Sequence, residues 1–315
     1  MQSPLALMQL TRALAEDSTH TTFKIAATLR GQDPQGLPFV ISRTNFCPCA
    51  FESLPANTYF GDSSTSIHAE TAVIFNSART EGADLYVTDP ICPDCMKNVI
   101  TAGIRAAYID TSGYAKPYAR RAGHTFIEMS HVMAHHAGIP VYMVDCAAGQ
   151  ITCLNDLRDD ATAILPAQQT TALGPILTHG EERNFAAHVL HLQDRWPDQD
   201  FATAQAVNAA SQIVFLTVTP DIIAGHAGDP SVIMEGKHNY IQRPLMRLLL
   251  TAKRMGLRLI MDTVTCSDLP SSRDMVNFIG IGGRQIRILN TKKSRDAHAV
   301  AAFDLLRSGN FLTFL

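Results

Sequence analysis

The sequence predicts an α/β protein with a three-layer α/β/α architecture in two tandem copies. Short segments rich in branched and aromatic side chains alternate with longer segments of helical periodicity, glycines and prolines separate them, and the second half of the chain resembles the first. Successive strands joined by helices run parallel, because only a crossover of about a dozen residues returns the chain in the same direction. We therefore expect a sheet with helices on both faces.

Local patterns define the first elements. Residues 4–16 place apolar side chains at roughly helical spacing, which predicts an opening helix. Residues 23–29 and 37–42 favour strands, and the Gly31–Gly36 region between them is typical of a turn.

The following segments alternate between helix and strand. Residues 69–79 predict a helix that Gly82 ends, and residues 92–102 predict a second helix. Strands are expected at 84–88 and 105–109, which are short and rich in branched or aromatic side chains. The last expected elements of this half are a helix at 130–137 and a strand at 140–144.

A domain boundary is expected within residues 147–183, which contain two prolines and several small polar residues. We predict a metal-binding, catalytic domain at 1–150 and a second domain at 151–315. Adding 177 to residues 86–109 aligns them with residues 263–286, which have a similar pattern. Any strand, turn, helix, glycine and strand unit resembles another, so the repeat is a hypothesis.

At this offset the two copies differ in their chemistry. Gly103 pairs with Gly280, whereas the two cysteines Cys92 and Cys95 pair with Leu269 and Ser272. Residues 244–247, upstream, contain no histidine. The second copy is therefore expected to lack metal ligands.

Bulk composition limits the class of protein. The 315 residues are 46% hydrophobic and 17% charged, which is typical of a folded globular chain. A net charge of −3 argues against a nucleic-acid partner and favours a small-molecule one. No secretory signal or membrane span is expected, and seven cysteines including one Cys-x-x-Cys favour a reducing compartment, the cytoplasm.

The most informative motif is His68-Ala69-Glu70 followed by Cys92-Pro93-Asp94-Cys95. Its histidine and two cysteines are the mixed nitrogen and sulfur ligands of a catalytic Zn²⁺ site that leaves a fourth position for water. Zinc lowers the pKa of bound water to about 7 and so makes it nucleophilic. Glu70 is then free to act as a general acid and base.

A closed zinc site that only stabilises the fold is the structural alternative. It needs a fourth protein ligand, and Cys47 or Cys49 is available for that role. Two ordinary free thiols, or a second metal site, are the other interpretations of these cysteines.

The segments HAETAVI (68–74) and DPICPDCMKNVITAGIRAAYI (89–109) resemble the cytidine/deoxycytidylate deaminase superfamily, in its deoxycytidylate-type and tRNA-adenosine-type branch. The resemblance covers residues of about 38–145 and implies the cytidine-deaminase-like form of the α/β/α fold. It implies that His68, Cys92 and Cys95 bind zinc and that Glu70 is the proton shuttle. It also implies that Asn45 and the backbone amide of Ala69 contact the substrate.

One departure concerns the loop before the first cysteine. The family usually has proline there, whereas Ile91 stands between Pro90 and Cys92. The helix expected at 130–137 favours the deoxycytidylate branch, and the tandem layout is similar to the larger bacterial cytidine deaminases.

The resemblance and the motif together predict hydrolytic deamination of a cytosine-type base in a free nucleoside or nucleotide of the CMP/dCMP kind. A purine or pterin base, or an RNA adenosine, is the alternative substrate. A zinc-binding regulatory module without turnover is the alternative class. We also expect a homodimer, or an internal pairing of the two copies that replaces it.

Three other features have ordinary explanations beside functional ones. His131 and His135 stand at i, i+4 spacing, which suits either metal or a helix face. Arg120-Arg121 suits either a substrate phosphate or solvent. Asn45 suits either a substrate contact or a turn after a strand.

Overall fold

A computed structural model of the chain describes residues 2–55, 57–155, 176–180, 184–223, 239–291 and 297–315.

A six-stranded mixed sheet is the centre of the first half, with the strand order β2-β1-β5-β6-β7-β8. Strands β5, β6 and β7 are parallel, whereas β1 pairs antiparallel with β2 and β5, and β8 pairs antiparallel with β7. The strands are β1 (Ala26–Gln32), β2 (Pro38–Thr44), β5 (Asp84–Val87), β6 (Ala106–Asp110), β7 (Val141–Asp145) and β8 (Gln150–Cys153).

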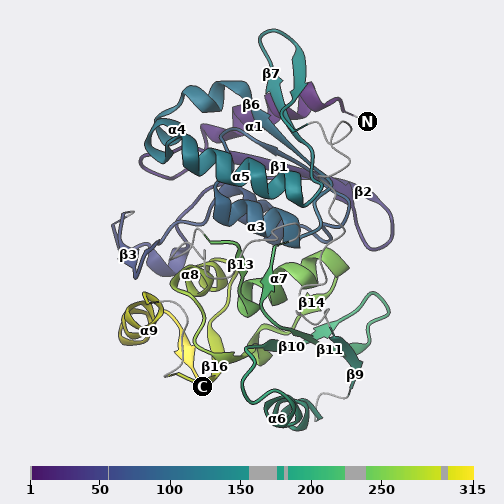
Figure 1. The fold of residues 1–315 in the computed structure, drawn as a ribbon, viewed down its shortest axis with the longest axis vertical. Coiled ribbons are helices and arrows are strands. Elements are labelled where there is room, and N and C mark those ends of the chain that lie inside the picture. The colour runs from purple at the N-terminus through teal and green to yellow at the C-terminus, as the bar shows by residue number, and fades with distance from the viewer. Residues whose placement is uncertain (1, 56, 156–175, 181–183, 224–238, 292–296) are drawn as a thin grey trace.

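Helices cover both faces of this sheet, as Figure 1 shows. The side chains of β5 alternate between the faces: Tyr86 packs with α1, whereas Leu85 and Val87 belong to the core shared with the other helices. The helices are α1 (Pro4–Ala15), α2 (Ala69–Asn76), α3 (Pro93–Thr101), α4 (Pro117–Ala122) and α5 (His124–His136). The predicted α/β class is confirmed.

Several boundaries differ from the expected ones. Helix α5 begins at His124, directly after Gly123 with its φ of +80°, and not at residue 130. Strand β8 and the small hairpin of β3 (Tyr59–Phe60) and β4 (Ser63–Ser64) were not expected, because these short segments lack an apolar run. The first sheet thus continues to Cys153.

The second half has its own sheet, in the order β17-β16-β15-β10-β11-β9, with β14 paired to β10. Strands β15, β16 and β17 are parallel, and β10 pairs antiparallel with β11 and β15. The strands are β9 (Ile176–His179), β10 (Ala202–Val207), β11 (Ile213–Val218), β14 (Arg258–Leu259), β15 (Thr265–Asp268), β16 (Gln285–Asn290) and β17 (Thr313–Phe314). A separate pair consists of β12 (Asp221–Ile222) and β13 (Ile241–Gln242).

The described elements of the two halves follow a similar order. In each, a helix precedes two antiparallel strands, and helices then alternate with three parallel strands; two helices, α4 and α5, precede the last of these in the first half and one in the second. The helices of the second half are α6 (Phe185–Arg195), α7 (Pro244–Met255), α8 (Ser272–Gly280) and α9 (Ala299–Ser308). By this order α7 corresponds to α2 and α8 to α3. Among the described residues, 3₁₀ turns lie at η1 (Cys49–Phe51), η2 (Thr111–Ala115) and η5 (Met261–Thr263).

Helices from both halves pack together between the two sheets. Helix α7 contacts α2 and α3, and Figure 1 shows α3, α7 and α8 in the middle of the molecule. Lys253 on α7 donates to the carbonyl of Ser77 at 3.0 Å. A single cluster of buried apolar side chains extends from β1 to the C-terminal strands. The two halves therefore share one hydrophobic core.

The bounds of α3 and α8 differ from the expected offset of 177 between the halves. Pro93 and Ser272 begin the two nine-residue helices, so the helix starts are 179 residues apart. Gly103 and Gly282, which follow the helices, both have positive φ angles of 71° and 94°. The bounds of β5 and β15 differ by 181 instead, because the connection to the helix is two residues shorter in the second half. No single ungapped offset fits both elements.

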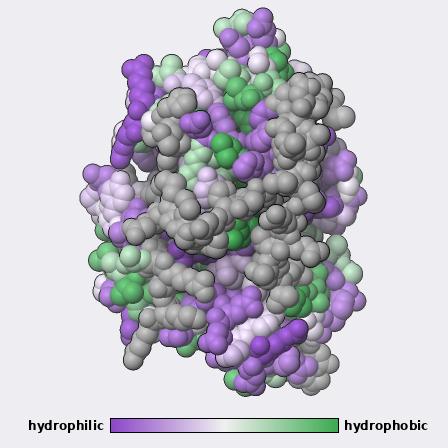
Figure 2. All heavy atoms as spheres, in the orientation of Figure 1, coloured by the Kyte–Doolittle hydropathy of each residue, from purple (hydrophilic) through white to green (hydrophobic). Residues whose placement is uncertain are grey.

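Hydrophobic and hydrophilic side chains are interspersed on the surface. On the face drawn in Figure 2, hydrophobic residues of the described ranges form separate small groups between hydrophilic ones. Among the helices that the structure describes, none combines the length and the hydropathy needed to cross a bilayer.

Candidate metal centre

Two helix N-termini bring the predicted ligands together. His68 is the N-cap of α2, and the preceding residue, Ile67, is fixed by paired backbone hydrogen bonds to Phe46 of 2.8 and 3.1 Å. Cys92 is the N-cap of α3, and Cys95 lies in its first turn. Nδ1 of His68 lies 3.5 Å from Sγ of Cys92 and 3.3 Å from Sγ of Cys95.

These separations fit a tetrahedral zinc ion. Zn–S bonds of about 2.3 Å and Zn–N bonds of about 2.0–2.1 Å place nitrogen and sulfur ligands about 3.5 Å apart. The three donor atoms of His68, Cys92 and Cys95 all lie within 4.8 Å of one another. Within the described ranges this is the only such group of three or more His, Cys, Asp or Glu residues, and no fourth side chain belongs to it. The residues therefore fit a metal with an open position.

Cys92 and Cys95 stand where backbone dipoles favour thiolates. The Sγ of Cys92 accepts a hydrogen bond from the backbone N–H of Cys95 at 3.3 Å. Burial raises the pKa of the Cys95 thiol well above its ordinary value, and the neighbouring Cys92 adds to this effect. Metal binding to these residues must therefore displace protons.

Glu70 is buried beside the ligands without being one of them. It occupies the first turn of α2 and its side chain is in hydrogen-bonding reach of Cys95. Burial raises the pKa of Glu70 to about 7, and the negative charge of Asp89 raises it further. Three smaller effects lower this pKa: the hydrogen bond from the Glu70 backbone N–H, the hydrogen bond with Cys95 and the charge of Arg273. A carboxyl group with this pKa can both take and give a proton near neutral pH.

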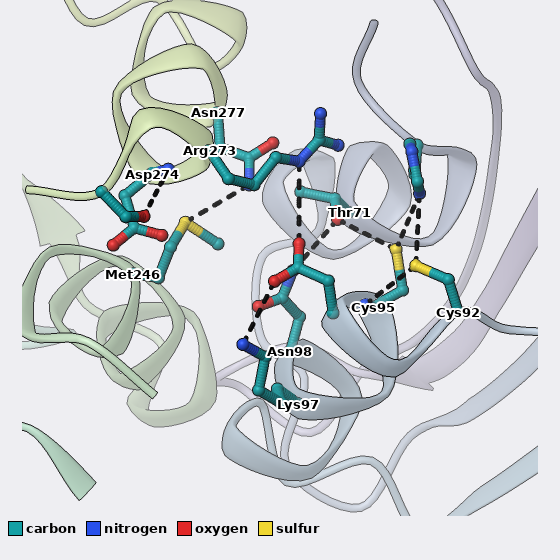
Figure 3. A network of polar contacts seen from close by, with 12 residues as sticks. Thr71, Cys92, Cys95, Lys97, Asn98, Met246, Arg273, Asp274 and Asn277 are labelled. Carbon is teal, nitrogen blue, oxygen red and sulfur yellow. Dashed lines mark hydrogen bonds and ion pairs between the residues drawn. The ribbon is translucent and has the colours of Figure 1, made fainter. Parts of the chain in front are cut away.

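Thr71 and Asn98 support the ligand Cys95. The Thr71 hydroxyl lies 3.7 Å from Sγ of Cys95, and the Asn98 amide donates to Thr71 Oγ1 at 3.2 Å. All three side chains are buried, and Figure 3 shows them side by side between α2 and α3. Contacts of this kind orient metal ligands.

Arg273, from the second half, was not among the expected site residues. It is 3% exposed and extends from α8 toward the first turn of α3 (Figure 3). Its guanidinium donates to the carbonyl of Ser66, two residues before His68, at 2.8 Å. It also lies 3.6 Å from Asp94, between the two cysteines. The second half thus contacts both segments that carry metal ligands.

A second link between the halves runs through Lys97. Its ammonium lies 3.3 Å from Asp94 Oδ1 and donates to the carbonyl of Ile241 on β13 at 3.3 Å. Asp94 therefore has a positive partner on α3 as well as on α8.

A cavity of about 410 Å³ lies next to this centre, lined by Phe23, Asp89, Lys116 and Tyr118 among others. The pKa of the Tyr118 phenol is raised by burial and then by the charges of Cys92, Glu70 and Cys95. Sequence reasoning missed Tyr118, because it follows α3 by a loop and a strand with no motif around it.

Charge in this cavity is balanced. Arg12 lies 3.2 Å from Asp110, Lys24 lies 3.5 Å from Glu16, and Lys116 lies 2.8 Å from Asp89. Each basic side chain thus has an acidic partner.

The side chain of Asn45 is engaged by its own chain. Oδ1 accepts from the hydroxyl of Ser18 at 2.6 Å and from the backbone N–H of Ile25 at 3.0 Å, and Nδ2 donates to the carbonyl of Phe23 at 2.7 Å. Ala69 is fully buried as the first residue of α2. The roles of both residues toward a substrate stay predictions.

The remaining expected candidates lie apart from the metal group. Cys47 is partly exposed and Cys49 exposed, both as free thiols, and neither belongs to the cluster of described ligands. Nε2 of His131 lies 3.1 Å from the Tyr114 hydroxyl, which accounts for one nitrogen of the i, i+4 pair. Arg121 lies over the ring of Phe23, at 5.9 Å from its centroid.

Comparison with known proteins gives partial similarities. No family model matches the chain. A segment of 59 residues is 37% identical to ComE operon protein 2 of Bacillus subtilis (strain 168) and covers 18% of this chain and 31% of that protein. The chain therefore spans about a third of the length of this relative.

Two solved structures of the dCMP deaminase from the cyanophage S-TIM5 are also similar in part. The complex with dCMP and dUMP aligns with 20% identity and a TM-score of 0.32, over 45% of this chain and 99% of that chain. The apo form aligns with 22% identity and a TM-score of 0.27, over 36% of this chain and 90% of that chain.

Proposed function

We propose that this protein is a zinc-dependent deaminase that hydrolyses the exocyclic amine of a cytosine-type base in a free nucleoside or nucleotide. The observation that carries the proposal is the convergence of His68, Cys92 and Cys95 next to a buried Glu70 that is not one of the three donors. A site that only stabilised the fold would use a fourth protein ligand. The open position and the free carboxyl group are what hydrolysis requires.

Each residue has a defined part in this proposal. His68, Cys92 and Cys95 hold the metal, which when bound supplies a water molecule of lowered pKa. With the metal bound, Glu70 would accept a proton from the water and deliver it to the ring nitrogen. It would then take the second proton from the hydroxyl group added to the ring carbon and deliver it to the departing amine. The products are ammonia and the corresponding carbonyl compound. The backbone amide of Ala69 and the side chain of Asn45 contact the base.

The cavity beside Tyr118 is the proposed substrate site, because two residues of its wall, Asp89 and Tyr118, interact electrostatically with Glu70. Its wall includes two aromatic rings, Phe23 and Tyr118, which suit a planar base. Its basic side chains are all paired with acidic ones, so the charge balance favours a nucleoside as much as a nucleotide.

We further propose that residues 1–150 form the catalytic domain and residues 151–315 a degenerate copy of the same fold without zinc ligands. The similar order of elements and the matched bounds of α3 and α8 support this. Helices α7 and α8 then cover the face of α2 and α3 inside one chain, as a partner subunit would. The predicted homodimer and the cytoplasmic location belong to the same proposal.

The test combines zinc content with turnover. Purified wild-type protein is analysed for zinc by mass spectrometry and incubated with cytidine, deoxycytidine, CMP, dCMP, guanine and adenosine while ammonia is measured. We expect one zinc per chain and ammonia from at least one cytosine compound. Glu70→Gln should keep the zinc and lose turnover by about 10²–10⁴-fold, whereas Glu52→Gln, at an exposed position, should behave as wild type.

Two results would contradict the proposal. Bound zinc without ammonia from any compound points to the regulatory module. Equal ammonia release by wild type and Glu70→Gln assigns the chemistry to other residues. Ammonia release from guanine or adenosine alone would support hydrolytic deamination but would contradict the cytosine-type substrate.

A further inference from the structure

The second half contains a cavity where the metal centre would lie in a copy of the first. The N-caps of α7 and α8 are Arg243 and Ser271, which correspond to His68 and Cys92. At the offset of 179, Cys95 corresponds to Asp274. A cavity of about 140 Å³ lies at these two helix N-termini, and Arg243 and Asp274 both line it.

Asp274 is the feature that indicates a ligand. It is 6% exposed, it lines the cavity, and its Oδ2 has no hydrogen-bond partner in the described part of the chain. Ser271 Oγ accepts a hydrogen bond from the Asp274 backbone N–H at 3.2 Å. This helix cap satisfies the backbone of Asp274 but gives its side-chain Oδ2 no donor. A buried carboxylate oxygen without a donor is costly, and a bound donor would remove that cost.

The cavity walls restrict what this donor is. Phe201, Leu245 and Leu269 give the cavity apolar sides, which suit a flat ring. The charged side chains in the wall are three carboxyl groups and one guanidinium, and they belong to Asp200, Asp268, Asp274 and Arg243. The excess of carboxyl groups favours a cation or a group with several N–H donors over an anion.

The size of the cavity sets a limit as well. A protein cavity of about 150 Å³ accommodates a benzene ring, so this one holds a single ring with a small substituent.

We propose that this cavity is a second, non-catalytic ligand site that binds a small planar ring bearing an amidine-type pair of N–H donors, with Asp274 as the acceptor. An amidine presents two parallel N–H groups, which match the two oxygens of one carboxylate. The site is separate from the metal centre, so the inference does not depend on the proposed deaminase activity.

The electrostatics of Asp274 agree with this ligand class. Burial raises the pKa of Asp274 to about 7, and the charge of Asp94 raises it further. The charges of Arg243 and Lys97 and the hydrogen bond with Ser271 lower the pKa, but by less than burial and Asp94 raise it. The ionised carboxyl group is therefore under-stabilised, and an amidinium cation supplies the missing partner.

The experiment is calorimetric titration of the zinc-loaded full-length protein at pH 8 with benzamidine, a ring carrying one amidinium group. Benzoate, which has the same shape but only acceptors, is the matched probe. We expect wild type to bind benzamidine in preference to benzoate. Asp274→Asn should weaken benzamidine binding at least tenfold, and Asp262→Asn, at an exposed position, should bind as wild type.

Two further variants keep the proposal falsifiable. Leu269→Phe fills the cavity and keeps the Asp274 carboxyl group. It should abolish benzamidine binding as well, so the proposal can be tested even where Asp274→Asn does not fold. Glu70→Gln should bind benzamidine as wild type, because the ligand does not occupy the metal centre. Failure of wild type to bind at 10 mM benzamidine overturns the proposal, as does preference for benzoate. Unchanged binding by both cavity variants, or loss of binding in Glu70→Gln, does so too.

Discussion

The Arg273 guanidinium donates a hydrogen bond to the backbone carbonyl of Ser66 across 207 residues of sequence, at 2.8 Å. Ser66 precedes His68 by two residues, so the contact fixes the approach of the chain to the first metal ligand. Both Arg273 and Ser66 are buried. Part of the metal centre is therefore held in place by the opposite half of the molecule.

Replacing Arg273 should destabilise the protein and weaken the metal site together. Arg273→Met leaves the Ser66 carbonyl without its donor and removes one of two positive partners of Asp94. We expect a loss of about 3 kcal/mol in the free energy of unfolding, together with weaker zinc binding. Urea unfolding and competition with a zinc chelator measure the two effects.

The matched control is Arg254→Met, which also removes an ion pair between the halves, with Glu81. Because Arg254 is about half exposed, its loss should cost less than about 1 kcal/mol and leave zinc affinity unchanged. Equal effects of the two variants would mean that Arg273 is only a structural contact between the halves.

Thr71→Val should weaken metal binding while preserving the fold. The variant removes the hydroxyl that lies between Cys95 Sγ and the Asn98 amide. Contacts to a metal ligand of this kind are worth about 10–100-fold in affinity. Thr11→Val is the control, because its buried hydroxyl bonds Thr28 on the other face of the sheet. If both threonine variants bind zinc equally, the contact does not orient Cys95.

Zinc affinity should rise with pH. Burial raises the pKa of Cys95, so at neutral pH the thiol carries a proton that the metal must displace. Each displaced proton contributes about a tenfold gain in apparent affinity per pH unit below the thiol pKa. Chelator competition between pH 6 and pH 8 checks the slope. Cys266→Ala, at a buried cysteine outside the metal group, should leave the slope unchanged. A flat profile would exclude protonated ligands.

Asp274→Asn should make the protein more stable at high pH than wild type. The pKa of Asp274 is raised from 3.8 to about 7, so its protonated form is favoured in the folded state. The stability that this group contributes is complete below pH 3.8 and is lost as pH rises through about 7. The amide imitates the protonated acid, and the variant should gain about 1–4 kcal/mol over wild type at pH 8 and less at pH 5. Urea unfolding at both pH values, with Asp262→Asn as the control, measures the difference; a gain of equal size at pH 5 and pH 8 is inconsistent with the shift.

Asn45→Ala separates a structural role from a substrate role. Its amide holds Ser18, Ile25 and Phe23 in place, so the variant should lose about 1–3 kcal/mol of stability. A substrate contact predicts in addition a fall in kcat/KM that persists under conditions where the variant is fully folded. Thermal unfolding and steady-state kinetics on the same preparation give both values. Unchanged kcat/KM would reduce Asn45 to a structural residue.

The metal group could be predicted from the sequence because its ligands belong to helix starts. His68 and Cys92 are the N-caps of two helices and Cys95 lies in a first turn, and the spacing at a helix start fixes where such side chains point. The α/β class followed from the alternation of elements for the same local reason. Glu70 follows from its place two residues after His68.

Arg273 and Asp274 could not be predicted in this way. Their significance depends on how α8 packs against α3, and no periodicity within α8 contains that information. The expected alignment places Ser272 opposite Cys95, whereas by the helix bounds Cys95 and Asp274 are each the third residue of their helix, a position that depends on where the connection before α8 ends. Tertiary contact thus decides what the local pattern leaves open.

Arg273 and Asp274 are consecutive residues of α8, and they point to different sides of the helix (Figure 3). A single helix therefore contacts two places. Arg273 contacts the segments that carry the candidate metal ligands, and Asp274 lines the second cavity. Thermodynamic reciprocity then applies: the factor by which zinc loading changes the affinity of the cavity equals the factor by which an occupant changes the affinity for zinc. Through this helix the second half is in a position to act as a sensor for the first.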